Sequence, residues 1–150
     1  MSDTTTRNQH LTKMKIWQQN VNRSLIAQTD VLHSTNPKEY DMILLQEPYI
    51  DFLGATRATL YWMAIYPPQH CDAPKRSQSI ILVNKRIATS SWTQINIPSF
   101  DITAVQLHGE QGTLEIFNIY NDCLHNDSLT SLAKHLQSIE HRAPPRTQGP

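Results

Sequence analysis

The sequence predicts a mixed α/β (α+β) fold in which a β-sheet is covered by helices on one face. Three features lead to this prediction: a β-α-β pattern comes first, a series of short strand-like segments separated by turns follows, and a helical segment comes last. The chain has 150 residues, which suits a single domain because domains usually contain about 100–200 residues.

The β-α-β pattern occupies the first third of the chain. Residues 15–20 read as a strand, and residues 24–35 place apolar side chains at helical spacing. Pro37 ends this helix, because the residue before a proline is disfavoured in the helical region. Residues 41–47 contain a continuous apolar run, which predicts a strand buried on both faces, and Pro48 ends it.

The remainder of the domain is predicted to be rich in strands before it closes with a helix. The predicted strands are residues 62–66, 79–83, 92–97, 102–107 and 114–120. A hairpin turn is expected at residues 109–112, where two glycines flank Glu110 and Gln111. The final helix is predicted over residues 128–141, whose leucines fall on one stripe.

The two ends of the chain are expected to lie outside the domain. Residues 1–13 are polar and read as a disordered lead, and residues 143–150 form a proline-rich coil that suits neither a helix nor a central strand. The predicted domain therefore spans residues 14–142.

Composition excludes two broad classes of protein. Lysine and arginine together number 13, as do aspartate and glutamate, so the formal charge is zero. A strongly basic surface that coats nucleic acid is thus ruled out, because neutralising phosphates requires a clear excess of cations. No apolar run approaches the roughly 18 residues of a spanning helix, so we expect no integral membrane protein.

Three apolar runs end in side chains suited to metal or phosphate chemistry: Asn20, Glu47 and Tyr120. If the three strands are neighbours that run the same way in one sheet, their carboxyl ends meet along one edge, where α/β sheets commonly bind ligands. A Walker loop, a dinucleotide-binding glycine motif, a nucleophile elbow and a zinc-binding helix motif are all absent from the sequence.

Glu47 carries the strongest of these signals. A carboxylate directly after an apolar run is costly to bury unpaired, and Mg²⁺, which prefers carboxylate oxygens, would offset that cost. The amide of Asn20 and the phenol of Tyr120 can hydrogen-bond to a phosphate or to a metal-bound water. The alternative is purely structural: Glu47 caps a turn with Pro48, and the other two residues simply end their strands.

At these residues the chain resembles the endonuclease/exonuclease/phosphatase superfamily of Mg²⁺-dependent phosphodiesterases, and within it the endonuclease domain of non-LTR (LINE-like) retrotransposons. The matching segments, in order, are Gln19-Asn20-Val21-Asn22, Leu45-Gln46-Glu47-Pro48, Ser79-Ile80-Ile81-Leu82-Val83 and Phe117-Asn118-Ile119-Tyr120. The resemblance implies a DNase I-like sandwich, in which two sheets pack face to face under flanking helices. It also implies that the full domain nicks target DNA, with the nucleus as the place of action.

The resemblance further implies a role for each site residue. Glu47 would bind Mg²⁺, with Mn²⁺ as a substitute, and Asn20 would orient a phosphate oxygen or the attacking water. Asn22 would add a second polar group beside it, and Tyr120 would hydrogen-bond to the scissile phosphate.

The basic pair Lys75 and Arg76 is a weaker candidate for contacts to the DNA backbone. No motif assigns these two residues to the site. The alternative is that they form a solvated pair of cations on the surface.

The sequence departs from the superfamily in one respect that concerns activity. Neither an Asp-x-Asn segment nor a Ser-Asp-His segment, which carry much of the acid–base chemistry in the superfamily, occurs in the chain. We therefore expect this chain to correspond to the N-terminal part of such a domain, and we expect it to be close to inactive as an enzyme when alone. We also expect the inner face of the first sheet to be exposed for lack of much of the second, so that the chain could self-associate through it.

Three alternatives to an endonuclease domain follow from the same observations. The chain could be a non-catalytic remnant of a transposon, or a small interaction module that pairs its half-sheet with a partner strand. It could also be a relative that acts on phosphoinositides or small phosphates.

Overall fold

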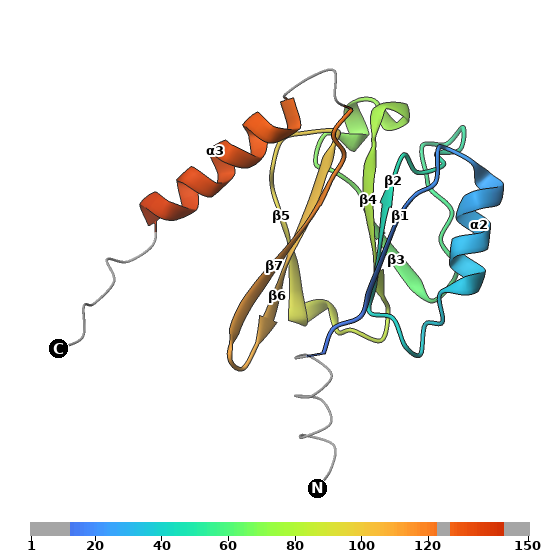
Figure 1. Cartoon of the computed structure of the whole chain (residues 1–150), viewed down its shortest axis with the longest axis horizontal. Helices are drawn as coiled ribbons and strands as arrows, with labels where there is room; N and C mark the ends of the chain where they lie inside the picture. Colours follow the sequence, from blue (N-terminus) through green and yellow to red (C-terminus); the bar gives the residue numbers. More distant parts are fainter. Residues whose placement is uncertain (1–12, 123–126, 143–150) are drawn as a thin grey trace, which may run out of the picture.

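Two β-sheets pack face to face between two helices (Figure 1), in a computed structural model that describes residues 13–122 and 127–142. The predicted lead, residues 1–13, falls outside the described residues except for Lys13, and the predicted coil at residues 143–150 falls outside them altogether. Among the described residues, no helix is both long and apolar enough to cross a membrane.

The first sheet has four strands in the order β1-β2-β4-β3. Their bounds are β1 Ile16–Asn20, β2 Met42–Gln46, β3 Trp62–Ile65 and β4 Ser79–Asn84. β1 and β2 are parallel and are joined by helix α2 (Leu25–Ser34), while β4 is antiparallel to both of its neighbours. Ser24 caps α2, since its hydroxyl accepts from the backbone N–H of Ala27 at 3.1 Å. The predicted β-α-β unit is therefore confirmed.

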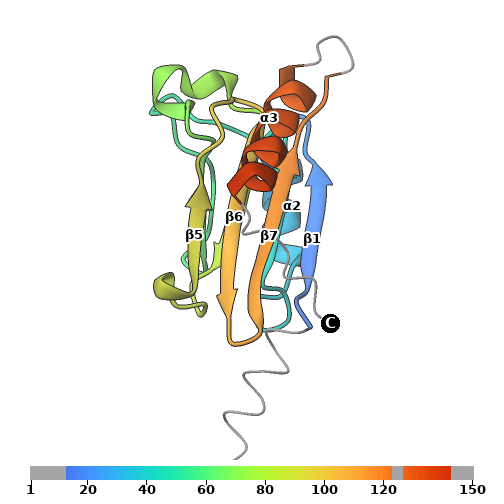
Figure 2. The same cartoon turned by 90° about the vertical axis from the view of Figure 1, so that its left-hand side faces the viewer.

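The second sheet is an antiparallel meander in the order β5-β6-β7 (Figure 2). Its strands are β5 Trp92–Ile95, β6 Ile102–Gly109 and β7 Gly112–Ile119, and helix α3 spans Asp127–Arg142. Gly109 pairs with Gly112, which confirms the predicted hairpin around Glu110 and Gln111. Three short 3₁₀ helices that were not predicted lie in the loops: η1 His70–Asp72, η2 Pro74–Arg76 and η3 Thr89–Ser91.

Strand β2 lies at the centre of the core and is buried at every position, as its apolar sequence predicted. Ile43 and Leu45 face α2, whereas Met42 and Leu44 face the second sheet. On the far side of the second sheet, Leu132 of α3 packs against the outer face of β6. The molecule thus has four layers: α2, the first sheet, the second sheet and α3.

The expected exposure of the inner face of the first sheet is wrong. Met42 and Ile81 on that face have no exposed surface, because Val105 and Leu107 of β6 and Ile116 of β7 cover them. Burying each such side chain contributes about 1.5–3 kcal/mol. Three strands after β4 are therefore enough to close the sandwich over this face.

The buried side-chain amide of Asn118 joins the two sheets near the C-terminal end of β7. The side chain of Asn118 donates from Nδ2 to the backbone oxygens of Leu45 and Ile80, each at 2.9 Å, and its Oδ1 accepts from the side chain of Gln46. Its backbone oxygen accepts from the hydroxyl of Ser79 at 2.7 Å. Every polar group of this residue that faces the core is therefore satisfied.

We predict that Asn118→Ala lowers the free energy of unfolding by about 2–4 kcal/mol. The change leaves the backbone oxygens of Leu45 and Ile80 and the side-chain amide of Gln46 without this hydrogen-bond partner. Urea unfolding measures the change. Asn96→Ala is the matched control, since this exposed asparagine should shift stability by less than about 0.5 kcal/mol. Equal stability of the two variants would show that the buried amide does not join the sheets.

Candidate functional site

The ends of β1, β2 and β7 come together at one edge of the sandwich. Asn20 pairs in register with Gln46, so Asn20 and Glu47 lie at the same edge of the first sheet. Tyr120 follows β7 and reaches this edge from the second sheet, where its hydroxyl donates to Oε1 of Glu47 at 2.9 Å. The expectation that all three strands share one sheet is wrong, because β7 belongs to the other layer.

The backbone at this edge adopts an unfavourable conformation. Asn22, Arg23 and Glu47 have φ angles of 52°, 58° and 50°, and they are the non-glycine residues with positive φ in the described part of the chain. The backbone N–H of Arg23 donates to the oxygen of Glu47 at 2.7 Å, which ties the two strained segments together. Such residues cost about 1–3 kcal/mol each and cluster at functional sites. The strain thus marks this edge independently of any motif.

Glu47 and Tyr120 are both half-buried, and their contact controls the chemistry of the phenol. The hydrogen bond to the carboxylate of Glu47 is the main cause that raises the pKa of Tyr120 above its ordinary value, and burial adds to it. The negative charges of Glu47, Asp122 and Asp101 act in the same direction. Tyr120 is therefore a neutral hydrogen-bond donor at physiological pH.

Asn20 and Asn22 form a small polar turn next to the carboxylate. The side-chain oxygen of Asn20 accepts from the backbone N–H of Asn22 at 2.9 Å, and both residues are exposed. This contact occupies the oxygen of Asn20 and leaves its amide NH₂ to donate to a ligand.

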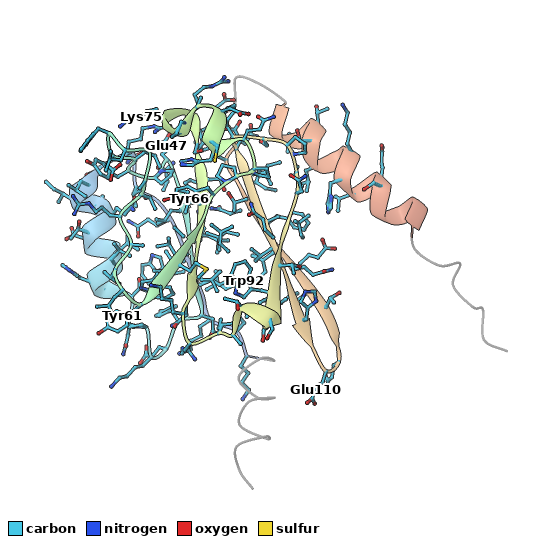
Figure 3. The ribbon with its side chains drawn as sticks, turned by 180° about the vertical axis from the view of Figure 1, so that it is seen from behind. Glu47, Tyr61, Tyr66, Lys75, Trp92 and Glu110 are labelled. Carbon is cyan, nitrogen blue, oxygen red and sulfur yellow. The ribbon has the colours of Figure 1, made fainter. Side chains whose placement is uncertain are left out.

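The two basic candidates lie in η2, at the same end of the sandwich as Glu47 (Figure 3). The ammonium of Lys75 donates to the backbone oxygen of Ile50 at 2.6 Å. The guanidinium of Arg76 lies over the ring of Phe100, with its central carbon 4.4 Å from the ring centroid. Both cations are therefore held in place by protein contacts, and both side chains remain exposed.

Sequence reasoning missed residues that position this site. Arg23 directly follows Asn22, and its guanidinium donates to the backbone oxygen of Ser77 at 3.3 Å, across 54 residues of sequence. Gln46 and Asn118 stood inside recognised motifs but were assigned no role. A polar side chain at an inward position of an apolar strand was the available signal for Asn118, because inward residues alternate along β7.

Glu47 is the carboxylate that accepts from Tyr120 at this edge, and the charges of Asp101 and Asp122 also act on that phenol. Within residues 13–122 and 127–142, no cluster of three or more histidine, cysteine, aspartate or glutamate side chains is placed to hold a metal ion. The arrangement can offer carboxylate oxygen, a phenol and an amide to a hard cation or a phosphate.

We predict that Glu47→Gln lowers the pKa of Tyr120 toward the ordinary tyrosine value, because it removes the carboxylate that favours the protonated phenol. Ultraviolet titration of tyrosinate absorbance measures the shift, with Tyr120→Phe identifying the signal and Glu110→Gln as a control at the far end of the molecule. Because the raised pKa favours folding only while the phenol keeps its proton, stability should fall as pH rises from about 10 through the raised value. In Tyr120→Phe this loss should be smaller; an identical alkaline loss in both proteins would contradict the assignment.

Comparison with known proteins gives a match at the level of structure. No protein-family model matches the chain, and no curated protein matches it. The fold is similar to the solved endonuclease domain of TRAS1, a telomere-specific non-LTR retrotransposon, with a TM-score of 0.63 and 14% sequence identity. The match covers 89% of this chain and 55% of that domain, so the chain spans about half of the neighbour's length. The expected two-sheet α/β sandwich is therefore confirmed, and its fold is similar to part of that solved endonuclease domain.

Proposed function

We propose that this chain forms the glutamate-bearing part of a Mg²⁺-dependent phosphodiesterase site whose substrate is nuclear DNA. The observation that carries the proposal is the pairing of Glu47 with Tyr120 across two sheets, at a strained backbone turn. The similarity of the fold to a retrotransposon endonuclease domain supports the same chemistry.

The residues at the site fit a weakly held Mg²⁺ ion. Mg²⁺ is commonly bound through one or two carboxylates together with substrate phosphates, so a single half-buried Glu47 is a sufficient protein ligand when DNA completes the site. Mn²⁺ accepts the same oxygen donors. When bound, the ion would neutralise charge on the phosphate and assist the attacking water.

The other side chains act on the phosphate directly in this proposal. The phenol of Tyr120 stays protonated and has a single O–H, which donates to Glu47. When an ion binds that carboxylate, the O–H would turn to donate to a phosphate oxygen, and the amide of Asn20 would donate to a second oxygen or to the water. Asn22 holds the side chain of Asn20 through its backbone N–H. Lys75 and Arg76 attract the flanking DNA backbone, since cations near a phosphate site raise its affinity for polyanions.

The proposal assigns no general base to this chain. Sequences of the Asp-x-Asn and Ser-Asp-His type are absent from the 150 residues, and loss of a general acid or base reduces rates by about 10²–10⁴-fold. Metal and phosphate binding are therefore the functions that the chain can supply by itself.

We predict that Mn²⁺ binds the chain weakly, with a dissociation constant of roughly 10⁻⁴–10⁻³ M, because one carboxylate seldom makes a tight site. Glu47→Gln should weaken this binding by tenfold or more, as measured by the electron paramagnetic resonance signal of free Mn²⁺. Glu110→Gln is the matched control, because this glutamate lies at the hairpin at the opposite end (Figure 3). Micromolar affinity that survives Glu47→Gln would place the ligand elsewhere.

We also predict that the 150-residue chain with Mg²⁺ nicks supercoiled plasmid no faster than buffer does, because the acid–base groups are missing. Conversion of supercoiled to open-circular DNA on an agarose gel measures the rate. Strong nicking that Glu47→Ala abolishes would show that the chain is a complete enzyme and that an unassigned residue serves as the base.

A further inference from the structure

The loop that follows β2 presents two large apolar side chains to solvent. Phe52 is 89% exposed and Leu53 is 78% exposed, and they are adjacent at the tip of the loop formed by residues 51–55. Among the described residues, these two are the most exposed of the large hydrophobic side chains. A contiguous exposed apolar site commonly marks a binding surface.

The 51–55 loop is held in one conformation by its own hydrogen bonds. The carboxylate of Asp51 accepts from the backbone N–H groups of Leu53 and Ala55, at 2.8 and 3.0 Å. The backbone N–H of Asp51 donates to the oxygen of Ala55 at 2.8 Å and closes the turn. Gly54 has a φ of +85°, and a Cβ on it would lie 3.0 Å from Pro74, so a larger residue would be strained there.

Contacts from three other segments anchor the same loop. Buried His70 lies 2.6 Å from the backbone oxygen of Gly54 through Nε2 and 2.7 Å from the hydroxyl of Ser77 through Nδ1. Lys75 donates to the oxygen of Ile50, and the hydroxyl of Tyr66 accepts from the N–H of Thr56 at 3.0 Å. Because the loop is ordered before any ligand arrives, binding through its tip would lose little conformational entropy.

The loop lies at the same end of the sandwich as Glu47 and among cations. Its anchor Lys75 is drawn beside that end in Figure 3, and the backbone N–H of Glu47 donates to the oxygen of Gln78, just after η2. The charges of Arg57 and Lys75 are close enough to help lower the pKa of Asp51, after the hydrogen bond from Ala55. An apolar tip flanked by cations suits a polyanion that also has apolar faces.

We propose that Phe52 and Leu53 form a wedge that packs against the bases of DNA while its backbone is held near Glu47. This inference rests on the proposed function, because it takes the occupant of the site to be a phosphodiester. Apolar wedges that partly unstack a base step, and aromatic rings that stack on bases, are recurrent ways in which proteins hold DNA. The flanking cations favour DNA over an apolar protein surface as the occupant.

The test measures DNA binding and base unstacking together. A short duplex with 2-aminopurine at a central position is titrated with the chain at low ionic strength, following anisotropy of an end label and 2-aminopurine emission. The wild-type chain should bind and raise the emission. A double variant, Phe52→Ser with Leu53→Ser, should bind at least about tenfold more weakly and leave the emission unchanged, since each stacked contact contributes strongly to affinity.

Two matched controls test whether the loss of any exposed apolar side chain weakens DNA binding. Ile26→Ser on α2 and Leu60→Ser before β3 remove apolar side chains that are 76% and 74% exposed, and neither should change DNA binding. All variants should unfold at the same urea concentration as the wild type, because the substituted side chains are exposed.

The outcomes distinguish this inference from the proposed function. Binding that survives the double variant, or that falls equally in the two controls, overturns the wedge and leaves the role of Glu47 to the Mn²⁺ titration. Binding that requires Phe52 and Leu53 but is unchanged in Glu47→Gln with Mg²⁺ present keeps the wedge and counts against the metal site. The wedge is also overturned if the wild-type chain binds no DNA. A protein partner that covers the 51–55 loop when DNA does not would overturn it as well.

Discussion

The buried side chain of Asn118 is the contact on which the geometry of the site depends. Its amide reaches from the second sheet to backbone oxygens of β2 and β4 in the first, and it accepts from Gln46 directly before Glu47. Tyr120 lies two residues further along the same chain segment. Because a buried amide is stable only when all of its hydrogen bonds are made, the two sheets have one favoured alignment, and this alignment brings the phenol of Tyr120 to Glu47.

The same edge carries the strained backbone of the molecule. The left-handed conformations of Asn22, Arg23 and Glu47 would relax if the segments were free, but the hydrogen bond between Arg23 and Glu47 and the packing of β1 on β2 hold them. The strain directs the carboxylate out of the sheet and toward the second layer. A core that is well packed below an unfavourable turn is a common arrangement where a protein presents side chains to a ligand.

The site and the 51–55 loop belong to one surface built by neighbouring segments. Glu47 directly follows β2, and the loop begins four residues later, so the site proposed to bind phosphate and the exposed Phe52 and Leu53 have a common support. Lys75 of η2 anchors the loop, and Gln78, just after η2, accepts from the backbone N–H of Glu47 at 2.9 Å. Binding a phosphodiester and packing against its bases would thus draw on the same rigid elements.

The sequence alone determined most of the local structure of this protein. Helical spacing, apolar runs and turn residues predicted the two helices and the strands to within two residues at each end, because these elements depend on neighbours close in sequence. The motifs also identified Glu47, Asn20 and Tyr120 as the residues to consider, although their chemical roles stay predictions. Only the tertiary structure decided that β7 lies in the second sheet, that three strands cover the inner face of the first, and that Asn118 and Arg23 support the site. It also revealed the exposed tip of the 51–55 loop. These features depend on contacts between residues far apart in the sequence: 72 positions separate Gln46 from Asn118, and 54 separate Arg23 from Ser77. Periodicity within a short window carries no information about which distant segments will meet.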